Sequence, residues 1–175
     1  MPKSSKKQIV EDEKKVVSAL QNNARESIDK IAKICKFSRQ KVWRIIKRLE
    51  NNKTIWGYHA VIDNQKINKK QYVILMKHNN LPISKKIADS MMRRDLGNLL
   101  KKLGVDVFGS YFIHGSYDWM LSINADDIKQ VKKFIDGVML QYKDNIDDIS
   151  VLEVIFKVEE FGIQNPNIEK IKDFF

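Results

Sequence analysis

Apolar residues recur at helical spacing in three short stretches near the N-terminus. The first follows a run of acids and predicts a helix over residues 11–21, with acids at its start, where the helix dipole favours them. Ser27 and Ser38 are suited to cap two further helices. Each of these has one apolar stripe: Ile28, Ile31, Ala32 and Cys35, then Val42, Ile45, Ile46 and Leu49. Three short helices, the last two joined by a tight turn, predict a trihelical helix-turn-helix unit.

The pattern changes after these helices. Residues 54–63 alternate between apolar and other residues in a way that is typical of a strand. Such a strand would complete a winged-type unit. A polar stretch follows at residues 64–70. We therefore expect a DNA-binding-type domain at residues 1–63, with a basic N-terminal arm, and a linker at residues 64–70.

The second half of the chain alternates between strand-like and helical stretches. The predicted order is strand, helix, strand, strand, helix, strand, at residues 72–77, 84–103, 105–114, 119–125, 126–142 and 147–158. This order is typical of a ferredoxin-like βαββαβ domain, an antiparallel sheet with helices on one face. The predicted fold class is α+β, with this domain at residues 71–160. A C-terminal extension at residues 161–175 has apolar residues suited to dock on the sheet or on a partner subunit.

Composition narrows the class of protein. Apolar residues make up 43% and charged residues 31% of the 175 positions, which is the balance of a soluble globular protein. No run of eighteen uncharged apolar residues occurs, so we expect no membrane span. Cys35 is the only cysteine and excludes an internal disulfide, which favours a reducing, cytoplasmic location.

The positive charge is confined to one end of the chain. Residues 1–70 carry 18 Lys/Arg against 7 Asp/Glu, a balance of +11. Residues 71–175 carry 14 Lys/Arg against 15 Asp/Glu, a balance of −1. Such asymmetry favours a module that meets a polyanion, joined to a module with another task.

The third predicted helix concentrates these cations on its outer face. If its apolar stripe faces inward, the outer face and flanks after the Ser38 cap carry Arg39, Gln40, Lys41, Trp43, Arg44, Lys47 and Arg48. Gln40 and Arg44 lie one turn apart, and glutamine can pair with adenine and arginine with guanine in the major groove. Lys41, Lys47 and Arg48 suit phosphates. Trp43 suits a thymine methyl or sugar, or equally the first helix.

A solvated helix whose cations only keep the protein soluble is the alternative interpretation. It would also have to explain the serine-led turn, the absence of acids from Ser38 to Leu49, and the +11 balance. We therefore expect this helix to contact double-stranded DNA.

Two motifs in order resemble the Lrp/AsnC (feast/famine, leucine-responsive) transcription regulators. Residues 24–63 are similar to that family's helix-turn-helix, through "AR-S", "IKRLE" and "I-GY-AV-D". The family's "G-x-YD" turn is present as Gly115, Ser116, Tyr117 and Asp118. The resemblance implies a homodimer, with tetramers or octamers as open alternatives, and an amino acid or related effector bound near that turn between dimers. Tyr117 and Asp118 could equally only close a hairpin.

Three positions depart from the family pattern. Ile45 stands where the family usually has arginine, so a common DNA contact would be lost. Lys53 replaces a glycine that suits the left-handed conformation. The first helix of the second domain is longer than usual, with a break expected at residues 93–97.

No motif indicates catalysis, a metal site or a cofactor. The chain has no glycine-rich phosphate loop, no zinc-like Cys/His spacing and no Ser/His/Asp pattern, and His59, His78 and His114 are scattered. Sirohaem decarboxylases resemble the same layout, but they tend to have His-Asn-Tyr where this chain has "HGSYD" and lack a basic recognition helix. A nucleoid-type architectural protein remains the second DNA-binding alternative.

Overall fold

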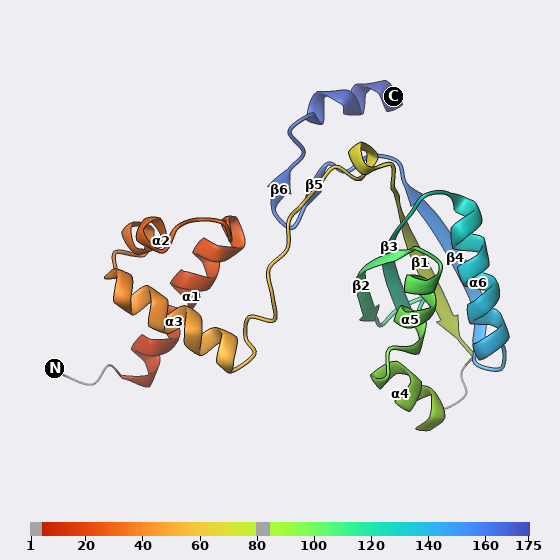
Figure 1. Ribbon diagram of the computed structural model, residues 1–175, viewed down its shortest axis with the longest axis horizontal. Coiled ribbons are helices and arrows are strands. Elements are labelled where there is room, and N and C mark those ends of the chain that lie inside the picture. The colour runs from red at the N-terminus through yellow and green to blue at the C-terminus, as the bar shows by residue number, and fades with distance from the viewer. Residues whose placement is uncertain (1–4, 80–84) are drawn as a thin grey trace. The chain divides into compact units, whose positions relative to one another are not determined.

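The computed structural model describes residues 5–79 and 85–175, and its contacts divide the chain into two compact units (Figure 1). One unit contains residues 1–61 together with residues 157–175, and the other contains residues 62–156. The expected basic arm lies partly outside the described residues, because residues 1–4 are not among them. No helix in the described parts of the chain is long and apolar enough to cross a membrane.

Three helices form the N-terminal unit, as the apolar stripes predict: α1 (Lys6–Asn22), α2 (Ile28–Cys35) and α3 (Arg39–Asn51). Ser27 and Ser38 cap α2 and α3 through hydrogen bonds from the backbone N–H three residues later. The prediction for α1 was wrong at its start, because Ser5 caps the helix five residues earlier than expected. The acids at 11–13 therefore lie inside α1, where they can reach α3.

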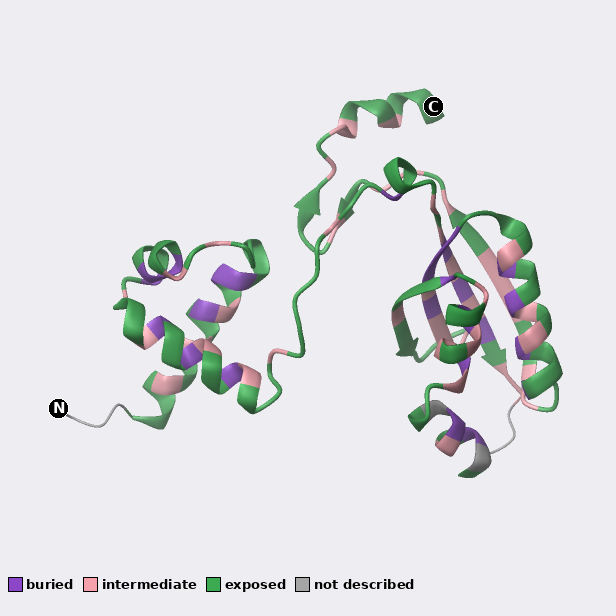
Figure 2. Ribbon diagram, in the orientation of Figure 1, coloured by how far each residue is buried: buried purple, intermediate pink, exposed green. Residues whose placement is uncertain are grey.

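The stripes meet in one small core, seen as the buried positions of these helices in Figure 2. It consists of Val16, Ala19, Leu20, Ile31, Ala32, Cys35, Val42, Ile45 and Leu49. Ile46, by contrast, is only partly buried. Each buried Val, Leu or Ile side chain of this core contributes about 1.5–3 kcal/mol.

The segment after α3 differs from the prediction. Residues 55–63 belong to no strand of the described chain, although their alternation is strand-like, so the prediction of a strand was wrong. Ile55 packs against the helical core and Trp56 is 93% exposed. Lys53 does adopt the left-handed conformation, with φ 62°, at the position where relatives are expected to have glycine.

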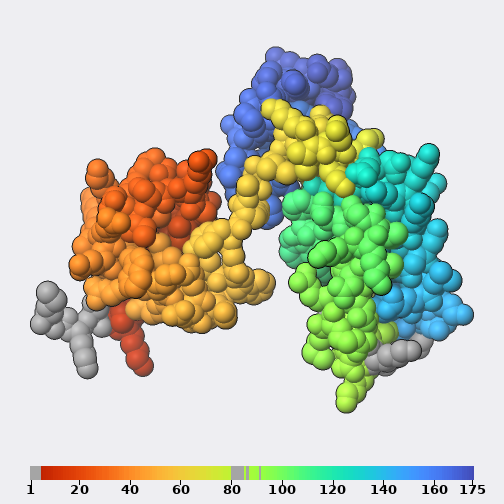
Figure 3. Space-filling model, in the orientation of Figure 1, coloured from red at the N-terminus to blue at the C-terminus, as the bar shows by residue number. Residues whose placement is uncertain are grey.

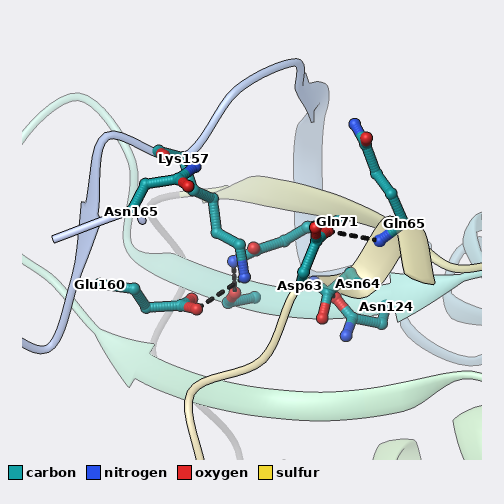
Figure 4. A network of polar contacts seen from close by, with 9 residues as sticks. Asp63, Asn64, Gln65, Gln71, Asn124, Lys157, Glu160 and Asn165 are labelled. Carbon is teal, nitrogen blue, oxygen red and sulfur yellow. Dashed lines mark hydrogen bonds and ion pairs between the residues drawn. The ribbon is translucent and has the colours of Figure 1, made fainter. Parts of the chain in front are cut away.

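A short 3₁₀ helix, η1 (Asn64–Ile67), begins the second unit (Figure 4). Asp63 caps it by accepting a hydrogen bond from the Gln65 N–H, 3.1 Å away. The Asn64 amide donates to the Asn124 side chain at 2.9 Å, and both residues are buried. The bond ties η1 to the sheet.

The second unit has the predicted order of elements: β1 (Lys70–His78), α4 (Lys85–Met92), α5 (Asp95–Lys102), β2 (Asp106–Phe112), β3 (Trp119–Ala125), α6 (Ile128–Tyr142) and β4 (Ile146–Val154). The sheet order is β2-β3-β1-β4, and every pair is antiparallel. The expected break in the first helix is confirmed, because Arg94 adopts φ 59° between α4 and α5. Ser84, expected at the start of that helix, lies outside the described residues.

One face of the sheet is covered and the other is open. The helices cover the face that carries Tyr72, Ile74 and Met76 of β1, which are buried with Phe134 of α6 (Figures 1 and 2). The alternate positions of the strands point away from the helices. These include Val73, Leu75, Tyr111, Met120 and Leu152, of which Tyr111 and Leu152 are 44% and 51% exposed.

The C-terminal segment returns to the first unit as a short hairpin, β5 (Glu159–Glu160) and β6 (Ile163–Gln164), followed by η2 (Ile168–Phe174). The rings of Phe161 and His59 meet edge-on, with centroids 4.6 Å apart. Lys157 anchors the hairpin, because its Nζ lies 2.7 Å from Glu160 and its carbonyl accepts from the Asn165 amide at 2.7 Å (Figure 4). The segment therefore contacts the stretch that follows α3.

Candidate DNA-binding interface

The outer face of α3 is exposed, as the sequence predicts. Helices α1, α2 and α3 form one continuous body, coloured red to orange in Figure 3. The exposed positions are Ser38, Arg39, Gln40, Trp43, Arg44, Lys47 and Arg48, and Lys41 is half-buried. Ile45 is only 4% exposed. A position that carries a cation in the resembled family therefore belongs to the core here.

Lys41 is held by α1. Its Nζ lies 2.7 Å from Asp12 Oδ2, and the Asp12 side chain is 5% exposed. The hydrogen bond from Lys41 lowers the pKa of Asp12 below its ordinary value, and the Gln8 amide also donates to this carboxylate at 3.0 Å. The Lys41 ammonium additionally lies 3.9 Å from the centre of the Phe37 ring. Lys41 therefore has a structural task besides any contact with phosphate.

Three other cations of α3 also have carboxylate partners. Arg48 Nε lies 2.6 Å from Glu13 Oε1, and Lys47 Nζ lies 2.8 Å from Glu50 Oε2. The Arg39–Asp29 pair is looser, at 3.6 Å. All three cations stay exposed, and surface pairs of this kind are worth about 0–1 kcal/mol, so a phosphate can replace the carboxylate at low cost.

Arg44 differs from these cations. Its Nε donates only a long hydrogen bond, 3.4 Å, to the backbone carbonyl of Gln40 one turn earlier. Within residues 5–79 and 85–175 it makes no ion pair. Gln40 and Arg44 thus lie together on the exposed face near the start of α3, with the guanidinium available for a partner outside the chain.

Sequence reasoning missed the partners of these cations. Asp12 and Glu13 were expected in the first turn of α1, where they would only favour the helix dipole. They instead lie near the middle of α1 and pair with α3. The available signal was Ser5, a good N-cap at the right distance before the acids.

Two side chains of the turn expected to bind an effector already have hydrogen-bond partners on neighbouring strands. Asp118 Oδ2 accepts a hydrogen bond from the His78 N–H at 2.7 Å, and the Asp118 N–H donates to the Met76 carbonyl at 3.0 Å. Tyr117 and Ser150 share a hydrogen bond of 2.8 Å between their hydroxyls. Gly115 has φ 156°, and its open side has no atom within 4 Å of where a Cβ would lie. Ser116 is exposed.

Among the described residues, no three His, Cys, Asp or Glu side chains gather in a way that could hold a metal ion.

Comparison with known proteins gives a family match for the N-terminal helices and structural matches for most of the chain. Residues 13–55 match the winged helix-turn-helix DNA-binding family. No curated protein sequence matches the chain. Several solved structures are similar over most of its length.

An AsnC family transcriptional regulator from Agrobacterium tumefaciens is 19% identical, with a TM-score of 0.61 over 85% of this chain and 92% of that one. LrpC of B. subtilis is 16% identical, with a TM-score of 0.59 over 91% and 99%. A transcriptional regulator from Neisseria meningitidis, solved in complex with L-Met, is 18% identical, with a TM-score of 0.63 over 94% and 98%. The chain therefore has the fold of the Lrp/AsnC regulators, and its residues 13–55 match the winged helix-turn-helix DNA-binding family.

Proposed function

We propose that this protein is a cytoplasmic, sequence-specific DNA-binding transcriptional regulator of the Lrp/AsnC type rather than an enzyme. The observation that carries the proposal is the pair Gln40 and Arg44, exposed together near the start of the second helix of a helix-turn-helix. The +11 balance of residues 1–70 supplies the attraction to DNA that does not depend on sequence. The proposed DNA-binding domain lies within residues 1–63. The stretch 64–70, expected as a linker, contains η1 and the start of β1 and belongs to the second unit.

The residues of α3 divide the work. Gln40 and Arg44 read base edges in the major groove, where a good bidentate pair is worth about 1–3 kcal/mol of discrimination. Lys47, Arg48 and Arg39 contact phosphates, which fixes the register of α3 along the groove. Lys41 contributes mainly by holding α3 on α1. Trp43, which is 52% exposed, packs on a thymine methyl or a sugar.

The open face of the sheet supports a homodimer. Leu152 and Tyr111 are about half exposed there, beside Val73, Leu75 and Met120. Apolar patches of this kind mark contact surfaces. Two copies related by a twofold axis would present two α3 helices to half-sites about one helical turn apart. Tetramers or octamers would add further half-sites.

An amino acid is the effector that this proposal favours. The L-Met complex of the similar Neisseria regulator is the support for that class of ligand. The turn Gly115–Asp118 is the proposed contact, through its exposed backbone, because the side chains of Tyr117 and Asp118 already have partners in the chain. An effector would act by shifting the oligomeric state and thereby the spacing of the recognition helices.

Selection of random DNA by the purified protein, followed by footprinting at physiological salt, tests the proposal. Discrete protected sites spaced by about 10 base pairs are the expected result. Uniform coverage without a recovered motif would contradict it and favour an architectural protein. Stoichiometric absorbance near the Soret region in purified protein would favour the decarboxylase alternative.

A further inference from the structure

A hollow of about 300 Å³ lies on the N-terminal unit beside α3, and neither Gln40 nor Arg44 is among its lining residues. Five parts of the chain line it: α1, the turn after it, α2, α3 and the extended segment that carries Tyr58. The lining residues are Leu20, Ala24, Glu26, Ile28, Ile31, Trp43, Ile46, Lys47, Glu50 and Tyr58. All of them belong to the same compact unit.

The hollow combines three kinds of surface. Its floor is aliphatic, from Leu20, Ile31 and their neighbours. Trp43 and Tyr58 supply aromatic surface and are 52% and 53% exposed, so about half of each residue is open to a ligand. Such aromatic faces attract cations.

Carboxylates complete the hollow on two sides. The Glu26 side chain is 19% exposed, and the Glu50 side chain is 31% exposed. The Tyr58 hydroxyl donates to Glu50 Oε1 at 3.2 Å, while Lys47 Nζ lies 2.8 Å from Glu50 Oε2. Burial and the neighbouring Glu50 carboxylate raise the pKa of Tyr58, so its hydroxyl stays protonated and acts as the donor.

We propose that this hollow binds a small organic cation, an apolar body that carries one ammonium group. The aliphatic floor would take the body, the faces of Trp43 and Tyr58 would flank the ammonium, and Glu50 would pair with it. Both carboxylates already pair with a lysine, Glu26 with Lys30 at 2.5 Å and Glu50 with Lys47 at 2.8 Å, so the ligand's ammonium would take the place of Lys47 at Glu50. An anionic ligand would have only Lys47 among the lining residues as a partner, and Glu50 already holds it. A neutral apolar ligand would contact the aliphatic floor but would have no charged group to pair with Glu50.

Binding of such a cation has a consequence for Lys47, which rests on the proposed DNA-binding function. The ligand's ammonium and the Lys47 ammonium compete for the same Glu50 carboxylate. When the ligand holds Glu50, Lys47 is released and can contact a phosphate. The hollow thus couples an organic cation to the affinity of α3 for DNA.

Three probes of one shape and different charge test the site: 2-phenylethylammonium, 2-phenylethanol and 3-phenylpropionate. For this titration we would use a variant with Trp56→Phe and Trp119→Phe, in which Trp43 is the only tryptophan. We expect saturable change of Trp43 fluorescence with the ammonium probe alone, at a dissociation constant of about 1 mM. Equal responses to all three probes, or none to the ammonium, would overturn the proposal.

Glu50→Gln is the decisive variant, because it keeps the shape and hydrogen-bonding capacity of the side chain. This substitution should weaken binding of the ammonium probe by about tenfold. Glu153→Gln, which removes an exposed carboxylate of the other unit, is the matched control and should leave binding unchanged. Unchanged affinity in Glu50→Gln, with circular dichroism showing a native fold, would overturn the assignment of Glu50.

DNA affinity forms a separate arm of the experiment. The ammonium probe should tighten binding of the wild type to DNA by about twofold to fivefold relative to ammonium chloride at the same concentration, and should not do so in Lys47→Ala. Probe binding without this effect would overturn the coupling to Lys47. Failure of the protein to bind DNA without any probe would instead count against the proposed function, since the fluorescence titration contains no DNA.

Discussion

The Lys41–Asp12 pair gives the sharpest test of how α3 is held on α1. Lys41→Ala removes the ammonium 2.7 Å from a carboxylate that is 5% exposed, and leaves only the Gln8 amide as its partner. Breaking a fully buried pair costs about 3–5 kcal/mol, and breaking an exposed pair about 0–1 kcal/mol. Because the Lys41 side chain is 36% exposed, we expect a loss of about 2 kcal/mol from the free energy of unfolding.

Urea unfolding followed by tryptophan fluorescence measures this loss. In a Trp119→Phe background the signal comes from Trp43 and Trp56 and reports the N-terminal unit alone. Lys14→Ala is the matched control, because the Lys14–Glu11 pair has side chains 69% and 52% exposed. It should change stability by less than about 0.5 kcal/mol. Equal effects of the two substitutions would refute the reasoning.

The pH dependence provides an independent check of sign. Lys41 lowers the pKa of Asp12 in the folded state, below its unfolded value of about 3.9. The pair's contribution is therefore fully present above that unfolded value and is lost as the pH falls through the folded one. Wild type and Lys41→Ala should differ most near pH 7 and converge as the pH falls through the lowered pKa of Asp12. A difference that stays constant with pH would show that Asp12 is not the cause.

Three further substitutions follow from the N-terminal unit. Ser38→Ala removes the cap of α3 and should cost about 1 kcal/mol by urea unfolding, whereas an effect as small as that of Lys14→Ala would contradict the cap. Lys53→Gly relieves the strain of the left-handed conformation at φ 62° and should raise the free energy of unfolding by about 0.5–1 kcal/mol, seen as a higher midpoint of thermal unfolding. A lower midpoint would show that the lysine side chain contributes more to stability than this strain costs. Lys47→Ala should weaken binding to every DNA sequence alike and reduce the slope of affinity against salt by about one ion, which titrations at several salt concentrations would detect.

The spacing of apolar residues predicts both folds well, because local periodicity reports which face is buried. The stripe of α3, the caps Ser27 and Ser38, and the break near Arg94 are confirmed. The fate of Ile45 could also be anticipated from its position in the stripe, and its burial explains why it need not be a cation.

Features that depend on distant partners were harder to predict. The alternation of residues 54–63 predicted a strand, but a strand requires a neighbouring strand, and the described chain offers none there. The pairing of Asp12 and Glu13 with α3 depends on how two helices cross, which apolar spacing does not specify. The hollow beside Trp43 could not be predicted either, because its lining comes from five separate parts of the chain.

The central claim is that α3 reads base sequence through Arg44. The most direct measurement compares Arg44→Ala with wild type on the DNA site recovered by selection and on random DNA of the same length. We expect a loss of about 1–3 kcal/mol on the selected site, relaxed preference at one base position, and little change on random DNA. Equal losses on both DNAs would contradict the claim and show that Arg44 contacts only phosphate.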